Sequence, residues 1–147
     1  MNIQASKMLH LGPWASRAAS AAPSLPGTSP TAIAFQLAAT LEAYEQDAFQ
    51  LENSGPDQAL WAEVDAEMDR IRSCCAAFPS LDRASTTLFV LHEKWLQALR
   101  LAAATSSPQA KHDLAELRGA HAQSVSRLRG QCLQRLTRRV PHPPRQE

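Results

Sequence analysis

The chain has 147 residues, of which 44% are apolar, and its formal net charge at pH 7 is +1. This length is typical of one domain, and the apolar content suffices for a single hydrophobic core. The longest apolar runs fall far short of the roughly 18 to 20 residues that cross a bilayer, which excludes a membrane-spanning helix. Three cysteines give no even disulfide framework, and an excess of arginine over lysine suggests a GC-rich genome, so we expect a cytoplasmic bacterial protein.

The first 29 residues predict a disordered arm. They are rich in Ala, Ser and Pro, and no acidic residue occurs before Glu42. Such a segment buries too little apolar surface to offset the entropy of ordering it. Two alternatives remain open. Acid-poor, Ser-rich leaders also occur as targeting segments, so residues 1–28 could direct export or organelle import. A short docking helix could instead form around four apolar residues, Ile3, Met8, Leu9 and Leu11.

Apolar residues at helical spacing predict two helices in the first half of the chain. The first begins after a Ser29 cap, with Pro30 at the first helical position, and stops at residues 53–56. Its apolar stripe is Ile33, Leu37, Leu41, Tyr44, Ala48 and Leu51. The second helix spans residues 57–78 and ends at Pro79. Its stripe is Leu60, Val64, Met68, Ile71, Cys75 and Phe78.

The second half of the chain predicts two further helices. Ser80 is expected to cap the third, which reaches Thr105 and carries Leu81, Ala84, Leu88, Leu91, Trp95 and Leu99. Ser107 and Pro108 repeat the cap-then-proline start. The stripe of the fourth helix is Leu114, Leu117, His121, Val125, Leu128, Cys132 and Leu136. Gly119 and Gly130 interrupt this helix, so a bend or early fraying near Gly130 is expected.

Four helices of about twenty residues, joined by short connections, predict an all-α fold. Neighbouring helices must then run antiparallel, which gives an up-down-up-down four-helix bundle over residues 30–139. The run of prolines in residues 140–147 predicts a short flexible tail. The expected architecture is similar in outline to small helical export chaperones of flagellar and type III secretion systems, with which the chain shares no motif.

Candidate chemical groups were compared with the spacing that each chemistry requires. Carboxylate-bridged metal sites in bundles use Glu-x-x-His pairs, and the sequence has none. Antiparallel pairing places His92 and His121 at one level, and Cys75 near Cys132 at another level about 12 Å away. These two levels are too far apart to serve one ion. Because no nucleophile and no phosphate-binding loop stand out either, we expect no cofactor, no metal and no enzymatic activity.

Charge is distributed unevenly along the chain. Residues 31–78 carry nine acidic residues against two arginines, and residues 118–147 carry seven arginines against one glutamate. The acidic and basic helices could neutralise each other across the bundle. The polarity could also orient a protein partner, or the last helix could contact nucleic acid. The candidate phosphate contacts are Arg127, Arg129, Arg135, Arg138 and Arg139.

Large apolar residues outside the main stripes indicate either a wide core or a second contact surface. We take four of them as candidate partner-binding residues, namely Phe35, Trp61, Phe89 and Leu96. The leading hypothesis is therefore a non-enzymatic binding module, such as an adaptor, chaperone or regulator, that binds another protein or a second copy of itself. A nucleic-acid-associated protein and an exported effector led by the N-terminal arm are the alternatives.

Overall fold

The computed structural model describes residues 28–55 and 57–138. These residues form four α-helices, α2 (Pro30–Ser54), α3 (Gln58–Cys75), α4 (Asp82–Ala104) and α5 (Pro108–Thr137), and a short 3₁₀ helix, η1 (Pro79–Leu81). No strand occurs within these two ranges. The expected tail lies outside the described residues, as does nearly all of the expected arm and export segment, so both remain predictions.

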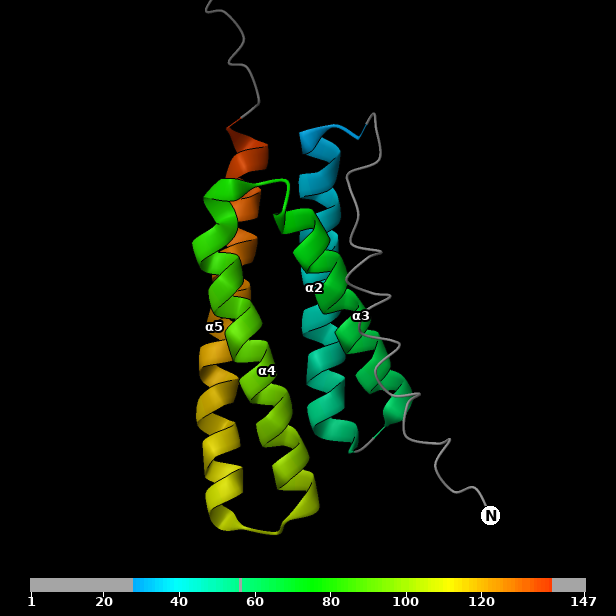
Figure 1. The fold of residues 1–147 in the computed structure, drawn as a ribbon, viewed down its shortest axis with the longest axis vertical. Coiled ribbons are helices and arrows are strands. Elements are labelled where there is room, and N and C mark those ends of the chain that lie inside the picture. The colour runs from blue at the N-terminus through cyan, green and yellow to red at the C-terminus, as the bar shows by residue number, and fades with distance from the viewer. Residues whose placement is uncertain (1–27, 56, 139–147) are drawn as a thin grey trace, which may run out of the picture.

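The helices pack as an antiparallel up-down-up-down bundle, which confirms the predicted fold class (Figure 1). Helix α2 packs against α3 and α5, and α4 packs against α5. Helices α3 and α4 also touch, but their contact is smaller than that of any of these three pairs. Among the described residues, no helix is both long and apolar enough to cross a membrane.

Two of the expected helix starts have the predicted caps, Ser29 and Ser107, and α3 has a cap that was not predicted, Asp57. The Ser29 hydroxyl accepts a hydrogen bond from the Ala32 amide at 3.1 Å, and Pro30 opens α2. Ser107 does the same for Ala110 at 3.5 Å, with Pro108 opening α5. Asp57 caps α3 through its carboxylate. These side chains satisfy amides that have no partner inside their own helices.

The predicted start of the third helix is wrong. Helix α3 ends at Cys75, and the backbone of Phe78 is non-helical, with φ −129° and ψ 84°. The ring of Pro79 disfavours a helical conformation at the preceding residue, which explains why α3 stops early. Ser80 therefore lies inside η1, and α4 begins at Asp82 without a side-chain cap hydrogen bond.

Early fraying of α5 near Gly130 is also wrong, because the helix continues to Thr137. Val125, Leu128 and Cys132 flank this glycine in sequence and are buried in the core. A glycine in a helix interior costs about 1 kcal/mol relative to alanine. The burial of even one such apolar side chain contributes about 1.5 to 3 kcal/mol, which exceeds that cost.

Candidate functional site

A cluster of polar and aromatic side chains occupies the centre of the bundle. The Tyr44 hydroxyl, on α2, lies 2.8 Å from Nδ1 of His92 and 2.6 Å from Nε2 of His121. His92 belongs to α4 and His121 to α5, and all three side chains are buried. A single phenol therefore joins three helices through two hydrogen bonds.

Asp65 on α3 brings the fourth helix into this cluster. Its Oδ1 lies 3.5 Å from Nε2 of His92. A carboxylate beside Nε2 favours the proton on that nitrogen, which leaves Nδ1 of His92 to accept from the Tyr44 hydroxyl. The Tyr44 oxygen then accepts from Nε2–H of His121. This pattern assigns one tautomer to each histidine.

Trp95 extends the cluster toward the surface. Its indole stacks on the His121 ring, with centroids 4.8 Å apart and planes 9° from parallel. Its Nε1–H donates to Oε1 of Glu52 at 2.6 Å, and the other Glu52 oxygen pairs with Arg118. An aromatic N–H is thus satisfied by a carboxylate that is itself neutralised by an arginine, as a buried polar group requires.

Burial keeps two members of the cluster, Tyr44 and His121, uncharged. Desolvation, and then the proximity of His92, lower the pKa of His121 to about 4. Desolvation also raises the pKa of Tyr44 far above its usual range, and the Asp65 carboxylate adds to this effect. Both groups are therefore uncharged at neutral pH. We interpret the cluster as a polar layer that fixes how the four helices are aligned with one another.

The sequence predicted part of this arrangement. The expected common level of His92 and His121 is confirmed by their shared bond to Tyr44. Sequence reasoning missed the roles of Tyr44 and Asp65. A signal for Tyr44 was present, because it is the single tyrosine of the chain and stands in the apolar stripe of the first predicted helix.

The three cysteines are buried, and none forms a disulfide. Burial raises the pKa of all three thiols, that of Cys75 to about 12. The Cys132 thiol donates to the carbonyl oxygen of Ala34 at 3.1 Å. Buried thiols of high pKa are poor nucleophiles, so these side chains act here as compact core residues.

The four candidate partner-binding residues differ in how far the structure exposes them to solvent. Phe35 on α2 is 62% exposed, whereas Leu96 on α4 is only 3% exposed and packs in the core. Leu96 cannot contact a partner unless the bundle opens, so it is removed from the candidate surface. Leu96 lies in the core together with Trp95 and Leu99. The core of α4 is therefore wider than the single apolar stripe that the sequence predicted.

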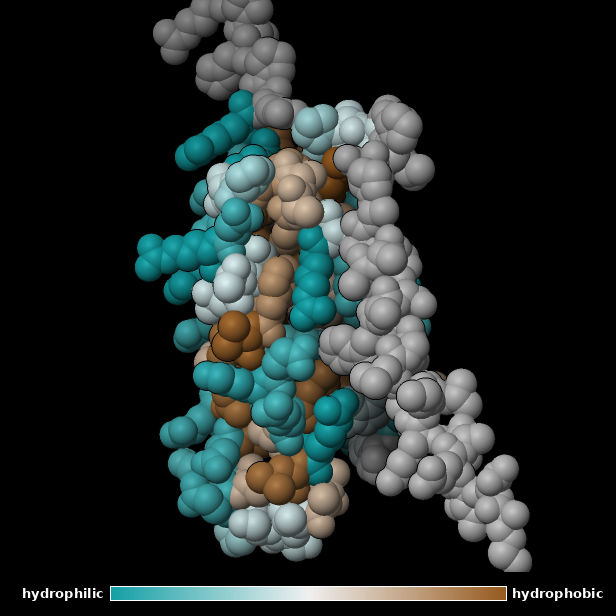
Figure 2. Space-filling view, viewed as in Figure 1, coloured by the Kyte–Doolittle hydropathy of each residue, from teal (hydrophilic) through white to brown (hydrophobic). Residues whose placement is uncertain are grey.

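Trp61 and Phe89 lie half-buried along the seam between α3 and α4. The Arg100 guanidinium of α4 lies 5.0 Å from the centre of the Trp61 ring. The Arg72 guanidinium of α3 lies 5.1 Å from the centre of the Phe89 ring and 3.6 Å from Glu93. Arginine side chains therefore partly cover both aromatic rings. On this face of the molecule, apolar atoms appear as separate patches among polar ones (Figure 2).

Phe49 joins Phe35 on the outer face of α2. Phe49 is 68% exposed, the largest exposure among the large apolar residues that are described. The two residues are separated by close to four helical turns, so they point to the same side of α2 at a distance of roughly 21 Å. The other exposed large apolar residues are on α4 and α5, namely Val90, Leu101 and Leu133.

The candidate phosphate-contacting arginines differ in their surroundings. Arg129 pairs with Glu45 of α2 at 2.5 Å, and the Arg135 guanidinium lies 5.2 Å from the centre of the Phe78 ring. Both side chains thus contribute to contacts within the bundle. Arg127 and Arg138 are exposed, and Arg139 lies outside the described residues.

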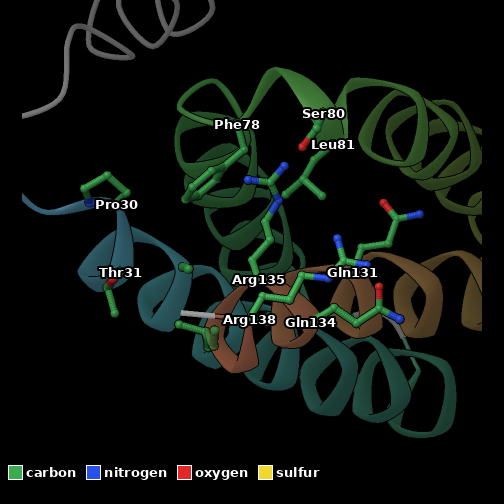
Figure 3. A pocket seen from close by; sticks show the side chains of 11 residues that line it. Pro30, Thr31, Phe78, Ser80, Leu81, Gln131, Gln134, Arg135 and Arg138 are labelled. Carbon is green, nitrogen blue, oxygen red and sulfur yellow. The ribbon is translucent and has the colours of Figure 1, made fainter. Parts of the chain in front are cut away.

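A hollow of about 400 Å³ lies at the end of the bundle where α2 begins and α5 ends. Arg135 extends from α5 toward Phe78, and Gln134 and Arg138 line the same part of the hollow (Figure 3). Pro30 and Thr31 line it from α2. The structure therefore brings two of the five candidate arginines, Arg135 and Arg138, to one hollow.

No protein-family model, curated protein or solved structure matches this chain. The fold and these surfaces are therefore the basis for the proposal that follows. They define an antiparallel four-helix bundle with a buried polar layer in its centre and two exposed phenylalanines on one outer helix face.

Proposed function

We propose that this protein is a non-enzymatic binding module that contacts a protein partner through the outer face of α2. The observation that supports this proposal is the exposure of Phe35 and Phe49 on that face. Single exposed apolar residues are common, but phenylalanines exposed by more than half are unfavourable in water and are typical of contact surfaces. The central polar layer holds α2 in place through Tyr44 and leaves the outer face of α2 free for binding.

The two rings can supply a useful share of a binding energy. Full burial of a phenylalanine side chain contributes about 1.5 to 3 kcal/mol, so two rings contribute about 3 to 6 kcal/mol. A millimolar complex requires about 4 kcal/mol and a micromolar one about 8 kcal/mol. Phe35 and Phe49 can therefore anchor a weak complex, and tighter binding needs polar contacts around them.

The charge of the first two helices indicates the chemistry of the partner. Residues 31–78, which include both helices, carry a net charge of −7 from nine acids and two arginines. Two of these acids, Glu45 and Glu52, are neutralised by arginines of α5. Glu42 lies exposed between Phe35 and Phe49 on the sequence of α2. We infer that the partner presents apolar residues flanked by basic side chains, such as a basic amphipathic helix.

Affinity capture with matched variants tests this proposal. The double variant Phe35→Ser/Phe49→Ser removes the anchors, and Val90→Ser/Leu101→Ser removes two exposed apolar residues from α4. We expect a stoichiometric protein, captured from lysate of the source cells after nuclease treatment, to be retained by the wild type and the α4 variant. The α2 variant should lose it. Equal capture by both variants would rule out the α2 face.

Nucleic-acid binding is the second candidate, and the exposure of Arg127 and Arg138 favours it. Eleven positions separate them, close to three helical turns, so both lie on one side of α5. Binding through them would weaken steeply with salt. A gel-retardation assay at low salt tests this alternative, and it fails if the wild type and Arg127→Gln/Arg138→Gln retard nucleic acid equally.

A further inference from the structure

Three acidic side chains meet between α2 and α3, away from the outer face of α2. Asp47 belongs to α2, and Glu63 and Glu67 stand one helical turn apart on α3. One carboxylate oxygen from each residue lies within 4.8 Å of the others. The turn between α2 and α3 sets this geometry, since antiparallel pairing places Asp47 beside the middle of the Glu63–Glu67 turn.

Glu67 distinguishes this cluster from ordinary surface acids. Its residue is only 3% exposed, and its Oε2 atom is buried without a hydrogen-bond partner among the described residues. A buried carboxylate oxygen with no donor is unfavourable by several kcal/mol if the group is ionised. Either a proton or a cation must compensate it. Burial, and then the negative charge of the neighbouring Asp47 carboxylate, raise the pKa of Glu67 to about 7, although the positive charge of Arg70 opposes this shift.

We propose that Asp47, Glu63 and Glu67 form a binding site for a hard divalent cation such as Ca²⁺. All three residues offer oxygen, which hard cations prefer to nitrogen or sulfur. Oxygens on opposite sides of one Ca²⁺ ion are about 4.6 to 5.2 Å apart. Three oxygens that all lie within 4.8 Å of one another can therefore share such an ion.

The partial exposure of the cluster leaves room for the remaining ligands. Glu63 is exposed and Asp47 is half-buried, so water can complete the six to eight oxygens that surround Ca²⁺. Arg70 is the cation that competes for this position, because its guanidinium lies 3.7 Å from Glu63. Both side chains of that ion pair are more than half exposed, so the pair is weak and an entering ion can displace it.

Calorimetric titration of the full chain with CaCl₂ tests the site. A pH of about 8 is suitable, because metal ligands must be deprotonated to bind the ion. We expect saturable binding of one ion and a rise in melting temperature, since the ion binds only the folded state. Glu67→Gln keeps the shape of the side chain and should weaken binding at least tenfold. Glu42→Gln removes the same charge from an exposed position of α2 and should leave the affinity unchanged.

Two further variants keep the result decisive if Glu67→Gln does not fold. Glu63→Gln alters an exposed ligand and should also weaken Ca²⁺ binding, whereas Arg70→Gln removes the competing cation and should strengthen it. Absence of saturable binding up to about 10 mM Ca²⁺ would overturn the proposal. This concentration lies far above the dissociation constants of most regulatory calcium sites. Equal weakening by Glu42→Gln and Glu67→Gln would overturn it as well, because it would show attraction to net charge alone.

Discussion

Tyr44 is the residue on which the central layer depends. Its hydroxyl is the common partner of His92 and His121, and all three side chains are buried. Hydrogen bonds of this kind contribute little when both partners are replaced together. Removal of one partner is costly, because the other is left buried and unsatisfied.

We therefore expect Tyr44→Phe to lower the free energy of unfolding by about 2 to 6 kcal/mol, because two histidine nitrogens are left unpaired at about 1 to 3 kcal/mol each. Urea denaturation followed by circular dichroism measures this loss. Thr87→Val is the control, because the Thr87 hydroxyl bonds only to the Arg83 carbonyl of its own helix. A Tyr44→Phe variant as stable as this control would show that the phenol has no role in the layer.

His121 predicts a dependence of stability on pH. Its pKa falls from an ordinary value of 6.5 to about 4 on folding. Between pH 6.5 and 4, the histidine is therefore mostly protonated in the unfolded chain and mostly unprotonated in the folded chain. The free energy of unfolding must then decrease as pH falls from about 6.5 to 4. Glu67 acts with the opposite sign, because its folded-state pKa is raised. A comparison of variants is needed to isolate the histidine.

His121→Gln keeps an N–H donor near Tyr44 and does not titrate. Between about pH 7 and 4.5, we expect the wild type to lose about 2 to 3 kcal/mol more than this variant. Urea denaturation at the two pH values gives both losses, and Glu67 contributes equally to each protein. Identical losses would contradict the assignment of His121 as a neutral, buried imidazole.

The sequence predicted the position of some of these residues along the bundle but not their side-chain contacts, for a physical reason. The level of His92 and His121 follows from helix rise and loop position alone, so it could be calculated. The hydrogen bonds of Tyr44 and the approach of Asp47 to Glu67 depend on how each helix is rotated about its axis. A rotation of a few tens of degrees moves a side chain between core and surface, and apolar spacing does not determine rotation that finely.

At the scale of the helices, the sequence predicted the first residue of a helix correctly where a capping serine is followed directly by a proline. Ser29 with Pro30 and Ser107 with Pro108 were predicted correctly. The pair Pro79 and Ser80 was misinterpreted, because the proline there precedes the serine and restricts Phe78 instead. The order of the two residues determines whether the segment starts a helix or forms a turn.

Helix α5 gives a prediction about its glycines. A Cβ atom added at Gly130 would have no atom within 4 Å outside the local helix backbone, and Gly55 is the one described glycine with positive φ. Gly130→Ala should therefore raise the free energy of unfolding by about 0.5 to 1 kcal/mol through helix propensity. Thermal and urea denaturation measure the change.

Gly55→Ala is the matched contrast and should lower the free energy of unfolding, because φ at Gly55 is 77°. Destabilisation by Gly130→Ala would show an unseen constraint in α5.

At the scale of the whole molecule, the uneven charge of the sequence is partly compensated inside the bundle. Glu45 and Glu52 of α2 pair with Arg129 and Arg118 of α5. The simple interpretation of the charge pattern, mutual neutralisation of helices, therefore holds for this interface. The exposed phenylalanines of α2 are not explained in this way, and they distinguish the proposed binding surface from the remaining surface of the bundle.

Site-specific photocrosslinking tests the binding surface most directly. A photoreactive phenylalanine analogue is placed at Phe35 or Phe49 of α2, or at Val90 of α4 as the exposed control, in protein produced in its source cells. We predict that positions 35 and 49 give the same discrete adduct with one protein, or with a second copy of the chain, and that position 90 does not. Absence of an adduct from both α2 positions, or the same adduct from position 90, would contradict the account.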